Sequence, residues 1–535
     1  MSSFPILSVI LFLPLAGAIG ALLLPRMAGW WWALLVALAD LALCLWLITQ
    51  FTMNGAGMQF AELRDWLPGL GVSYALGVDG VSLFLPALNA LLTAVAVGAS
   101  WPVARRGDRS REYFTLLLLL SFGMMGVFLA TNLLLFYVFW EVMLIPAYLL
   151  VGMFGGPRRS YAAIKFVLYT AAGSLLMLVG IIATGALVSS ASGAPFTLDL
   201  AALLREGVTA LPRTTQIWLF LAFAAAFAVK VGLFPLHSWV PDAYGEAPTA
   251  VVVLIAGVMA KTGAYGFVRF NLALFPEASR ALTPLMSALA VAGILYFALQ
   301  ALVAADFKRL LAYVSISHMS VIVLGTFALN TQGVEGGILQ MVNHGILIAA
   351  LFLIAAFIER RTGSRRLADF GGLATRTPWL ATVFLLTALA TLGLPGLNSF
   401  AGEFLAFLGA FQASAVYGTL GTLVVIPAAW YMLRFFQGVT EGPPSEVVES
   451  AAAASGGGAS LSGSQAPGDR PSRLPDLRAG ELTVLAPLLV LMIVLGILPG
   501  LLTARMEPTI NQLLAPTTHT TTTHPISGPP QAATR

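Results

Sequence analysis

Long apolar runs, separated by short polar segments, follow one another along almost the whole chain. A helix needs about 20 apolar residues to cross the hydrocarbon core of a bilayer. Stretches of this kind cover residues 4–24, 30–51, 78–99, 113–131, 133–154, 161–188, 215–236, 247–271, 282–304, 310–329, 334–358, 378–410, 416–437 and 482–503. The stretch 113–154 is too long for one crossing, so a tight turn is predicted at Thr131 and Asn132. The pattern predicts an all-α polytopic membrane protein with about 14 transmembrane helices.

Composition supports this fold class and excludes several kinds of site. Of the 535 residues, 58% are hydrophobic and 10% are charged, whereas a soluble domain carries about 25% charged residues. The single cysteine, Cys44, excludes a disulfide within the chain and also an iron–sulfur cluster, which needs about four thiolates. No glycine-rich turn joins a strand to a helix, so no dinucleotide site is predicted. The net charge of +4 is small and is interpreted as membrane topology, not as affinity for nucleic acid.

Positive charges in the loops indicate which side of the membrane each loop faces. Alternate loops, beginning with the one after the first span, carry 18 arginines and lysines, and the opposite set carries seven. Cytoplasmic loops are enriched in positive residues, so the first set is predicted to be cytoplasmic and both termini are predicted on the outer side. The first run lacks a positive leading region and is interpreted as a retained helix rather than a signal peptide.

Prolines interrupt two of the predicted spans. Pro235 and Pro241 follow the seventh span, and Pro395 lies inside the twelfth. Proline removes a backbone donor and disrupts helical hydrogen bonding, and in a membrane the freed groups need protein or water around them. Paired broken helices are typical of transporters with inverted repeats around a polar midplane site. Because the two breaks are five spans apart, we predict two inverted five-helix repeats, each with one broken helix.

The breaks and the composition together predict the organisation of the chain. Its parts are an N-terminal three-helix segment (1–110), a first repeat with spans 4–8 (111–275), a second repeat with spans 9–13 (276–437), a flexible cytoplasmic linker (438–480), a last transmembrane helix (481–503) and a disordered tail (504–535). The linker is rich in Ala, Ser, Gly and Pro, and the tail in Thr and Pro, compositions that are typical of flexible segments.

Ionisable residues inside the spans are few, and their types are informative. The arginines cluster in loops or at the edges of spans. The lysines inside spans are Lys165, Lys230 and Lys261. Arginine cannot release its proton in a protein, whereas a buried lysine can, so this partition favours proton transfer. The other ionisable residues at depth are Glu141, His318, His344 and Glu403. Such groups are expensive to place in a membrane, which makes a functional role the first hypothesis.

Several candidates also have structural explanations. Glu141 could form an ion pair with a lysine of a neighbouring helix, and each histidine could be a satisfied core residue. Lys165 could extend to the cytoplasmic surface, and His237 could bond a carbonyl freed by the adjacent helix break. Asp306 and Lys308 lie at the cytoplasmic start of a helix, where capping and the bias in loop charge explain them. Lys165, His237, Asp306 and Lys308 are therefore secondary candidates.

Six stretches carry a resemblance to a known family. They read GVDGVSLFL, FWEVMLIP, FAVKVGLFPLHSWVPDAYGEAPTA, LQALVAADFKRLLAYVSISHM, QMVNHG and GLPGLNSFAGEF. In this order, over roughly residues 70–440, they resemble the antiporter-like subunits of respiratory complex I, the proton-translocating NADH:quinone oxidoreductase. Among those subunits the chain is most similar to subunit M.

The resemblance implies roles for the residues at depth. In that family a line of ionisable residues runs along the middle of the membrane, and it matches Glu141, Lys230, Lys261, His318, His344 and Glu403. Glu141 and Lys230 would be its core pair, and Glu403 the group that exchanges protons with the outer side. One departure is Tyr244, where family members often carry a histidine, so a histidine in that loop is not required here.

The resemblance also implies partners and a location. The chain would translocate protons as a membrane-arm subunit, driven by redox chemistry in other subunits. No cofactor is expected in this chain, whereas NADH, FMN, iron–sulfur clusters and quinone are expected on the other subunits. Expected partners are the other membrane-arm subunits, including neighbouring antiporter-like subunits, together with the lipid bilayer and protons. The expected location is the bacterial cytoplasmic (inner) membrane.

Three alternatives fit the same pattern. The chain could be a subunit of a multi-subunit cation/proton antiporter or of a membrane-bound hydrogenase, and neighbouring genes would separate these from complex I. It could also be a structural membrane anchor without transport. The anchor hypothesis predicts that Glu141→Gln leaves both assembly and pumping intact.

Overall fold

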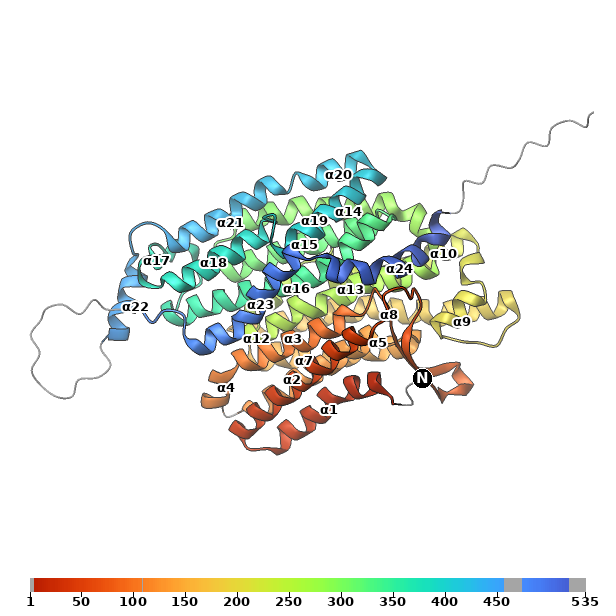
Figure 1. Cartoon of the computed structure of the whole chain (residues 1–535), viewed down its shortest axis with the longest axis horizontal. Helices are drawn as coiled ribbons and strands as arrows, with labels where there is room; N and C mark the ends of the chain where they lie inside the picture. The colour runs from red at the N-terminus through yellow and green to blue at the C-terminus, as the bar shows by residue number, and fades with distance from the viewer. Residues whose placement is uncertain (1–3, 108, 457–473, 519–535) are drawn as a thin grey trace, which may run out of the picture.

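The computed structural model describes residues 4–107, 109–456 and 474–518, and most of its regular structure is helical. The long helices lie alongside one another, so their ends gather at two opposite ends of the bundle (Figure 1). The short helices α4 (Trp101–Arg106), α17 (Leu373–Arg376) and α22 (Glu446–Gly456) lie at one end. Helix α9 (Leu200–Arg205) lies at the other.

Within the described ranges, 12 helical segments are long and apolar enough to cross a membrane. Those formed by one helix are α1 (Ile6–Leu23), α2 (Arg26–Gln50), α5 (Ser110–Leu129), α8 (Arg159–Ser192), α10 (Arg213–Val231), α14 (Pro276–Val303), α15 (Phe307–Thr326), α16 (Thr331–Thr362) and α23 (Ala479–Ile497). The others combine α6 (Leu133–Val142) with α7 (Leu144–Phe154), α20 (Ala415–Thr422) with α21 (Val425–Thr440), and the four pieces α12 (Thr249–Leu254), η3 (Ile255–Met259), α13 (Ala260–Gly266) and η4 (Phe267–Leu272).

Two shorter apolar helices occupy the remaining predicted spans. They are α3 (Phe84–Ala99) and α18 (Pro378–Thr391), of which α18 is followed by α19 (Asn398–Ala413). The predicted polytopic all-α architecture is therefore confirmed. The predicted turn between spans four and five is also found: α5 ends at Leu129, and the side chain of Asn132 caps α6 by accepting from the backbone N–H groups of Leu134 and Leu135.

A β-hairpin was missed by the search for apolar spans. Strands β1 (Gln59–Leu67) and β2 (Val72–Val78) pair antiparallel, with Leu67 opposite Val72. The Glu62 carboxylate on β1 accepts hydrogen bonds from the backbone N–H groups of Leu7 (2.7 Å) and Ser8 (3.2 Å), so the hairpin caps the start of α1. Beside it, burial raises the pKa of Tyr74, whose hydroxyl lies 2.7 Å from the Ser8 hydroxyl.

The first helix break lies near Pro235, as predicted, but the role predicted for Pro241 is wrong. Helix α10 ends at Val231, and Gly232 follows with φ +78°. Helix α11 then runs from Trp239 to Glu246 and contains Pro241 in its first turn. Backbone N–H groups in a first turn have no partner within the helix, so a proline there interrupts nothing.

The second break lies between α18 and α19, around Pro395. Gly393 (φ +70°) and Gly396 (φ +93°) flank this proline and adopt backbone angles that side chains disfavour. Each predicted repeat therefore contains one interrupted helix, α10–α11 in the first and α18–α19 in the second. The repeat boundaries themselves stay a prediction.

The two central segments are α16 and the composite helix over 249–272. Every residue in the most apolar 18-residue window of each is buried. Peripheral helices instead expose large apolar side chains, among them Leu168, Val179, Trp218 and Val303. Such side chains suit a lipid environment, while ionisable residues on the central segments are enclosed by protein.

The end of the chain differs from the prediction. The last span was expected over 481–503, but α23 ends at Ile497, and α24 (Gly500–Thr518) follows after Pro499. The first part of the predicted disordered tail is thus helical, because Leu502, Met506 and Ile510 form a buried stripe at a spacing of four residues. Residues 519–535 lie outside the described part. In the predicted flexible linker, α22 is a helix, and 457–473 also lie outside it.

Candidate functional site

Lys261 and His344 are in contact at the centre of the bundle, and both are 0% exposed. Lys261 on α13 places Nζ 2.6 Å from the Ala256 carbonyl oxygen and 2.7 Å from Nδ1 of His344 on α16. In this contact either nitrogen can be the donor, depending on which ring nitrogen, Nδ1 or Nε2, carries the imidazole proton. Nε2 of His344 has no hydrogen-bond partner among the described residues.

The π-helical segment η3 explains part of this contact. Ala256 lies in η3, five residues before Lys261. A π-turn widens the helix locally, and such turns are frequent at functional sites. Here it leaves a main-chain carbonyl available to the lysine, which donates a hydrogen bond to it in addition to its contact with His344.

His318 connects His344 to the second broken helix. Its ring on α15 stacks with the His344 ring at 5.5 Å between centroids and 23° between planes. On its other side, Nδ1 of His318 lies 2.7 Å from Oε1 of Glu403 on α19. The approach is close but too oblique for a hydrogen bond, since this Nδ1 has no hydrogen-bond partner within the described ranges. The contact is an ion pair only when the His318 ring is protonated.

The Glu403 carboxylate is also held by neutral polar groups. Its Oε1 accepts from the Ser399 hydroxyl and from Nε2 of Gln340, each at 3.0 Å. A cavity of about 20 Å³ lies beside it, which is room for about one water molecule. The cavity is lined in part by His318, Thr391 and Tyr431. The helix break therefore places a hydratable space next to a carboxylate and an imidazole.

Glu141 and Lys230 form the other end of the arrangement. Lys230 is 1% exposed, and its Nζ has no hydrogen-bond partner in the part of the chain described. It lies 4.8 Å from the centre of the Trp140 ring and interacts electrostatically with the half-buried Glu141 on α6. The two charges therefore interact through space, without a direct hydrogen bond.

Between the two ends, α10 and α13 pack closely. A Cβ added at Gly263 would lie 3.1 Å from Cβ of Lys230 and 2.7 Å from the Phe227 carbonyl oxygen. No hydrogen bond between described residues joins Lys230 to Lys261. The structure thus brings Lys261, His344, His318 and Glu403 into consecutive contact and leaves Glu141 and Lys230 as a separate neighbouring pair.

Lys165 and Asp242 belong to a separate cluster at the half-helix α11. Lys165 Nζ lies 2.8 Å from Oδ2 of Asp242, and Nη2 of Arg309 lies 3.1 Å from Oδ1 of the same carboxylate. Arg158 pairs with Glu246 at 3.5 Å. These ion pairs attach α11 to α8 and α15, and they make no contact with the chain from Lys261 to Glu403.

The remaining secondary candidates also lie outside that chain of contacts. Asp306 is the N-cap of α15, accepting from the backbone N–H groups of Lys308 and Arg309. The Lys308 ammonium lies 3.0 Å from a carboxylate oxygen of Glu359. His237 is half-buried, its ring is 4.6 Å from that of Phe297, and its Nδ1 has no described hydrogen-bond partner.

Some polar residues of the interior were missed. Gln340 lies one turn before His344 on α16 and bonds both Ser399 (2.8 Å) and Glu403. Asn343 donates to the Asn398 carbonyl (2.6 Å), and Asn398 donates back to the Asn343 carbonyl (3.1 Å). Amides in an apolar run were the available signal, because buried polar groups need partners.

Asp79 and Arg269 form a buried polar pair outside this site. Asp79 accepts from the backbone N–H groups of Val81 (3.0 Å) and Ser82 (3.2 Å). It also forms a two-pronged ion pair with the buried Arg269 guanidinium, at 2.6 and 2.5 Å. This pair ties the start of α3 to η4.

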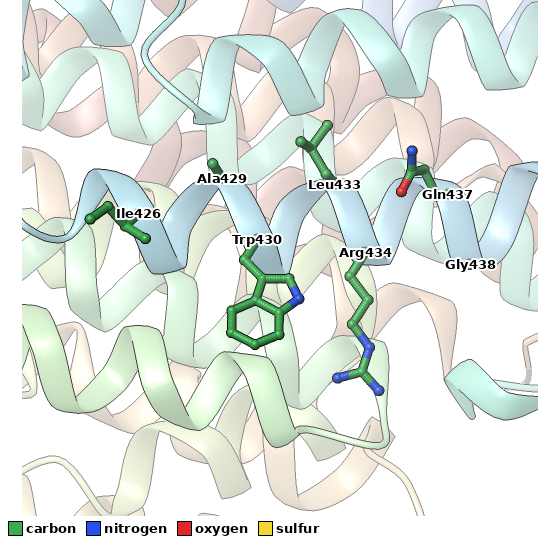
Figure 2. A pocket seen from close by; sticks show the side chains of 7 residues that line it. All are labelled: Ile426, Ala429, Trp430, Leu433, Arg434, Gln437 and Gly438. Carbon is green, nitrogen blue, oxygen red and sulfur yellow. The ribbon is translucent and has the colours of Figure 1, made fainter.

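A second hollow is not part of this site. It has a volume of about 610 Å³, is wide open, and runs along one face of α21 (Figure 2). Its side chains include Ile426, Trp430, Leu433 and Arg434, and Trp430 is 63% exposed. A shallow apolar face of one peripheral helix suits contact with lipid or another subunit better than it suits chemistry.

The described residues contain no group of three or more His, Cys, Asp or Glu side chains that could hold a metal ion.

Comparisons with known proteins agree with this architecture. Residues 130–426 match the family described as NADH:quinone oxidoreductase/Mrp antiporter, TM. The NADH-quinone oxidoreductase subunit M of Rhodobacter capsulatus is 38% identical over 95% of this chain and 96% of its own length.

Solved structures give the same result. A chain of respiratory complex I from Thermus thermophilus with bound NADH has a TM-score of 0.82 and 33% identity, covering 96% of this chain and 99% of that one. An Mrp complex from Dietzia sp. shares the fold, with a TM-score of 0.77 and 23% identity over 94% of this chain and 52% of that one. The chain belongs to the NADH:quinone oxidoreductase/Mrp antiporter family, and within it to the M subunits of NADH-quinone oxidoreductase.

Proposed function

We propose that this chain is a proton-translocating membrane-arm subunit of NADH:quinone oxidoreductase, and that protons move along a line of buried ionisable side chains. The line consists of Glu141, Lys230, Lys261, His344, His318 and Glu403. The chain itself would carry out no redox chemistry. It would convert a change in charge, arriving from neighbouring subunits, into the movement of a proton.

One observation carries the proposal. Lys261, His344, His318 and Glu403 come from four different helices and lie in consecutive contact, at 2.7 Å, 5.5 Å between rings, and 2.7 Å. Each can gain and lose a proton. A purely structural core would be more stable with apolar residues at such positions, since isolated buried charges are costly.

The helix breaks and the core pair have complementary tasks in this mechanism. Glu141 would set the tendency of Lys230 to hold a proton, because the two interact electrostatically without being locked in a hydrogen bond. Water entering at the break after α10 would connect Lys230 with Lys261. At the other end, the cavity beside Glu403 and His318 would connect the line with the outer side.

The energies involved are compatible with this scheme. Moving one charge across 100 mV requires about 2.3 kcal/mol, and a change of one pKa unit corresponds to about 1.4 kcal/mol. Opening and closing a Glu–Lys interaction in a low-dielectric interior changes the proton affinity of the lysine by amounts of this order. A modest movement around Glu141 would therefore be enough.

The proposal extends to the surroundings of the chain. NADH, FMN, iron–sulfur clusters and quinone would be bound by other subunits, and neighbouring antiporter-like subunits would contact this one. We place the protein in the bacterial cytoplasmic membrane with both termini outside. The end of the bundle that contains α4, α17 and α22 would then face the cytoplasm, in keeping with Arg360 and Arg361 at that end of α16.

Replacement of Lys230 by Ala in the assembled complex tests the function. We expect NADH oxidation to persist while the number of protons pumped per electron into sealed vesicles falls several-fold. Arg434→Ala is a matched control, because it removes one exposed cation from α21 without touching the line. Undiminished pumping by Lys230→Ala would reject the role. Intact assembly and pumping after Glu141→Gln would instead favour a structural anchor.

A further inference from the structure

Asp40 is a buried carboxyl group that the proposed line does not use. It lies on α2, slightly more than halfway along the helix, and is only 1% exposed. Its Oδ1 has no hydrogen-bond partner among the residues described. Asp40 is a single aspartate in an otherwise apolar run, so the search for apolar spans did not single it out.

The elements packed around α2 supply no charge to balance Asp40. These elements are α1, α3, α4 and α5. Neither α1 nor α3 contains an ionisable residue. The ionisable residues of α4 and α5 lie in α4 and in the first turn of α5, at one end of the bundle: Arg105, Arg106, Arg111, Glu112 and Tyr113. On α2 itself, Arg26 is about four turns away, and Cys44 is one turn further along.

A cluster of neutral polar side chains lies at the level of Asp40. The indole N–H of Trp30 donates to the Val97 carbonyl (2.9 Å), which aligns the start of α2 with the end of α3. Ten residues further along α2, Asp40 is therefore level with the region of Asn89 on the antiparallel α3. Asn89 donates to the Ser121 hydroxyl (3.1 Å), and Thr93 donates to the same hydroxyl (3.0 Å).

The ionised form of Asp40 would be strongly disfavoured here. A carboxylate with no balancing cation and an unpartnered oxygen costs several kcal/mol at such depth, so the neutral acid is the resting form. The unpartnered oxygens of Asp40 and Asn89 offer acceptors for a water molecule, which needs about 2–4 polar partners. Such a water could pass a proton to and from the carboxyl group.

We propose that Asp40 is a proton-binding site, occupied in the resting protein and exchanging its proton through the cluster of Asn89, Thr93 and Ser121. The site lies beside the line from Glu141 to Glu403, not in it. Helix α3 separates the two: a Cβ at Gly257 would lie 2.5 Å from Leu92, and one at Gly345 would lie 2.7 Å from Leu88. The proposal does not require the line itself to conduct.

Infrared spectroscopy of the assembled complex tests this inference. Wild-type complex and Asp40→Asn are compared at neutral pH in H2O and in D2O. We expect a carbonyl stretch of a protonated carboxyl group that the variant lacks and that shifts on deuteration. Asp65→Asn, which removes an exposed carboxyl group of the hairpin, is the control and should leave that band in place. Absence of the band, or a band that does not shift in D2O, would overturn the proposal.

A second pair of variants keeps the test decisive if Asp40→Asn fails to assemble. Asp40→Glu retains the acid, so its protonated-carboxyl band should persist at a slightly different frequency. Asn89→Leu preserves volume but removes the proposed water site, and deuterium exchange of the Asp40 band should slow several-fold. Exchange at the wild-type rate in Asn89→Leu would contradict the route. Because neither readout measures pumping, a failure here is separable from a failure of the Lys230→Ala test.

Discussion

The ammonium nitrogen of Lys261 lies 2.7 Å from Nδ1 of His344 at a point where both side chains are fully buried. If both were protonated, two unit charges this close would repel by roughly 6 kcal/mol at an effective dielectric constant of about 20. The pair therefore favours one excess proton. In the proposed mechanism, a proton that arrives at one member displaces the proton of the other, so this exclusion would couple the occupancy of the two sites.

Lys261→Arg separates the need for a cation from the need to release a proton. Arginine remains charged in proteins, so it would retain the positive charge beside His344 but could not pass its proton on. We expect NADH oxidation to continue in the assembled complex, and pumping per electron to fall several-fold, to a level similar to that of Lys261→Gln. Proton uptake by sealed vesicles measures this ratio.

A matched change elsewhere controls for the size of the guanidinium group. Lys308→Arg alters a buried lysine that is paired with Glu359 and lies outside the line. Arginine can keep this ion pair, so pumping should remain close to the wild-type value. Normal pumping by Lys261→Arg would mean that this position needs charge alone, which contradicts its proposed role in proton transfer.

Glu403→Gln tests the last member of the line. Glutamine has nearly the same shape and can still accept the hydrogen bonds of Ser399 and Gln340, so assembly should be normal. It cannot bind and release a proton, and it removes the charge beside His318. We expect pumping to decrease several-fold, measured per electron in vesicles.

Ser399→Ala separates the role of the Glu403 carboxyl group from that of the hydrogen bond that Ser399 donates to it. The variant removes one hydrogen bond to Glu403, which lowers stability by about 1 kcal/mol, but it leaves the titratable group in place. Pumping per electron should therefore remain close to the wild-type value, because the carboxyl group can still bind and release a proton. If Ser399→Ala impaired pumping as much as Glu403→Gln, the effect would have to be assigned to structure rather than to proton exchange.

The sequence was sufficient to predict which residues stand out in the membrane interior, but not how they meet. Charged and imidazole groups in apolar runs are visible in one dimension, because each carries a cost that must have a reason. Contact between Lys261 and His344 depends on the rotation of α16 and on a π-helical turn at Ala256. Neither feature has a signature in the periodicity of apolar residues.

The features that were missed share one physical cause. A search for runs of about 20 apolar residues is insensitive to short elements, so it passed over the hairpin around Glu62 and the amphipathic helix α24. It also gave no sign that Arg269 is buried. In the structure a counter-charge from Asp79, far away in the sequence, makes its burial tolerable.

The ion pair between Arg269 and Asp79 predicts an asymmetric response to mutation. Arg269→Leu leaves the Asp79 carboxylate buried without its cation, which should destabilise the protein by about 3–5 kcal/mol. The double variant Asp79→Asn/Arg269→Leu removes both charges, and the asparagine can still cap the backbone N–H groups of Val81 and Ser82. The double variant should therefore recover most of the loss. Thermal unfolding of the purified complex and the amount of assembled subunit measure the stability of each variant. Equal losses of stability in the single and the double variant would contradict the pairing of Arg269 with Asp79.

Close packing of α16 on α19 is what holds Gln340 near Glu403, and a glycine makes it possible. A Cβ at Gly336 would overlap the backbone nitrogen of Ala406 and lie 2.7 Å from the carbonyl carbon of Leu405. Backbone atoms cannot move aside as a flexible side chain can, so Gly336→Ala should force the helices apart. The expected loss is at least about 1–3 kcal/mol, the usual range for overpacking.

The effect of Gly336→Ala on function should exceed its effect on stability. Separation of the two helices would lengthen the 3.0 Å hydrogen bond from Gln340 to Glu403 and displace the carboxylate from its place in the line, so pumping should fall even in complexes that still assemble. Gly438→Ala is the matched control, because a Cβ there meets nothing within 4 Å in the same kind of helical backbone. In measurements of thermal unfolding and of vesicle pumping, Gly438→Ala should behave like the wild type. Gly336→Ala should be clearly impaired in both measurements. Wild-type pumping by an assembled Gly336→Ala complex would show that the α16–α19 spacing does not control the proposed proton path.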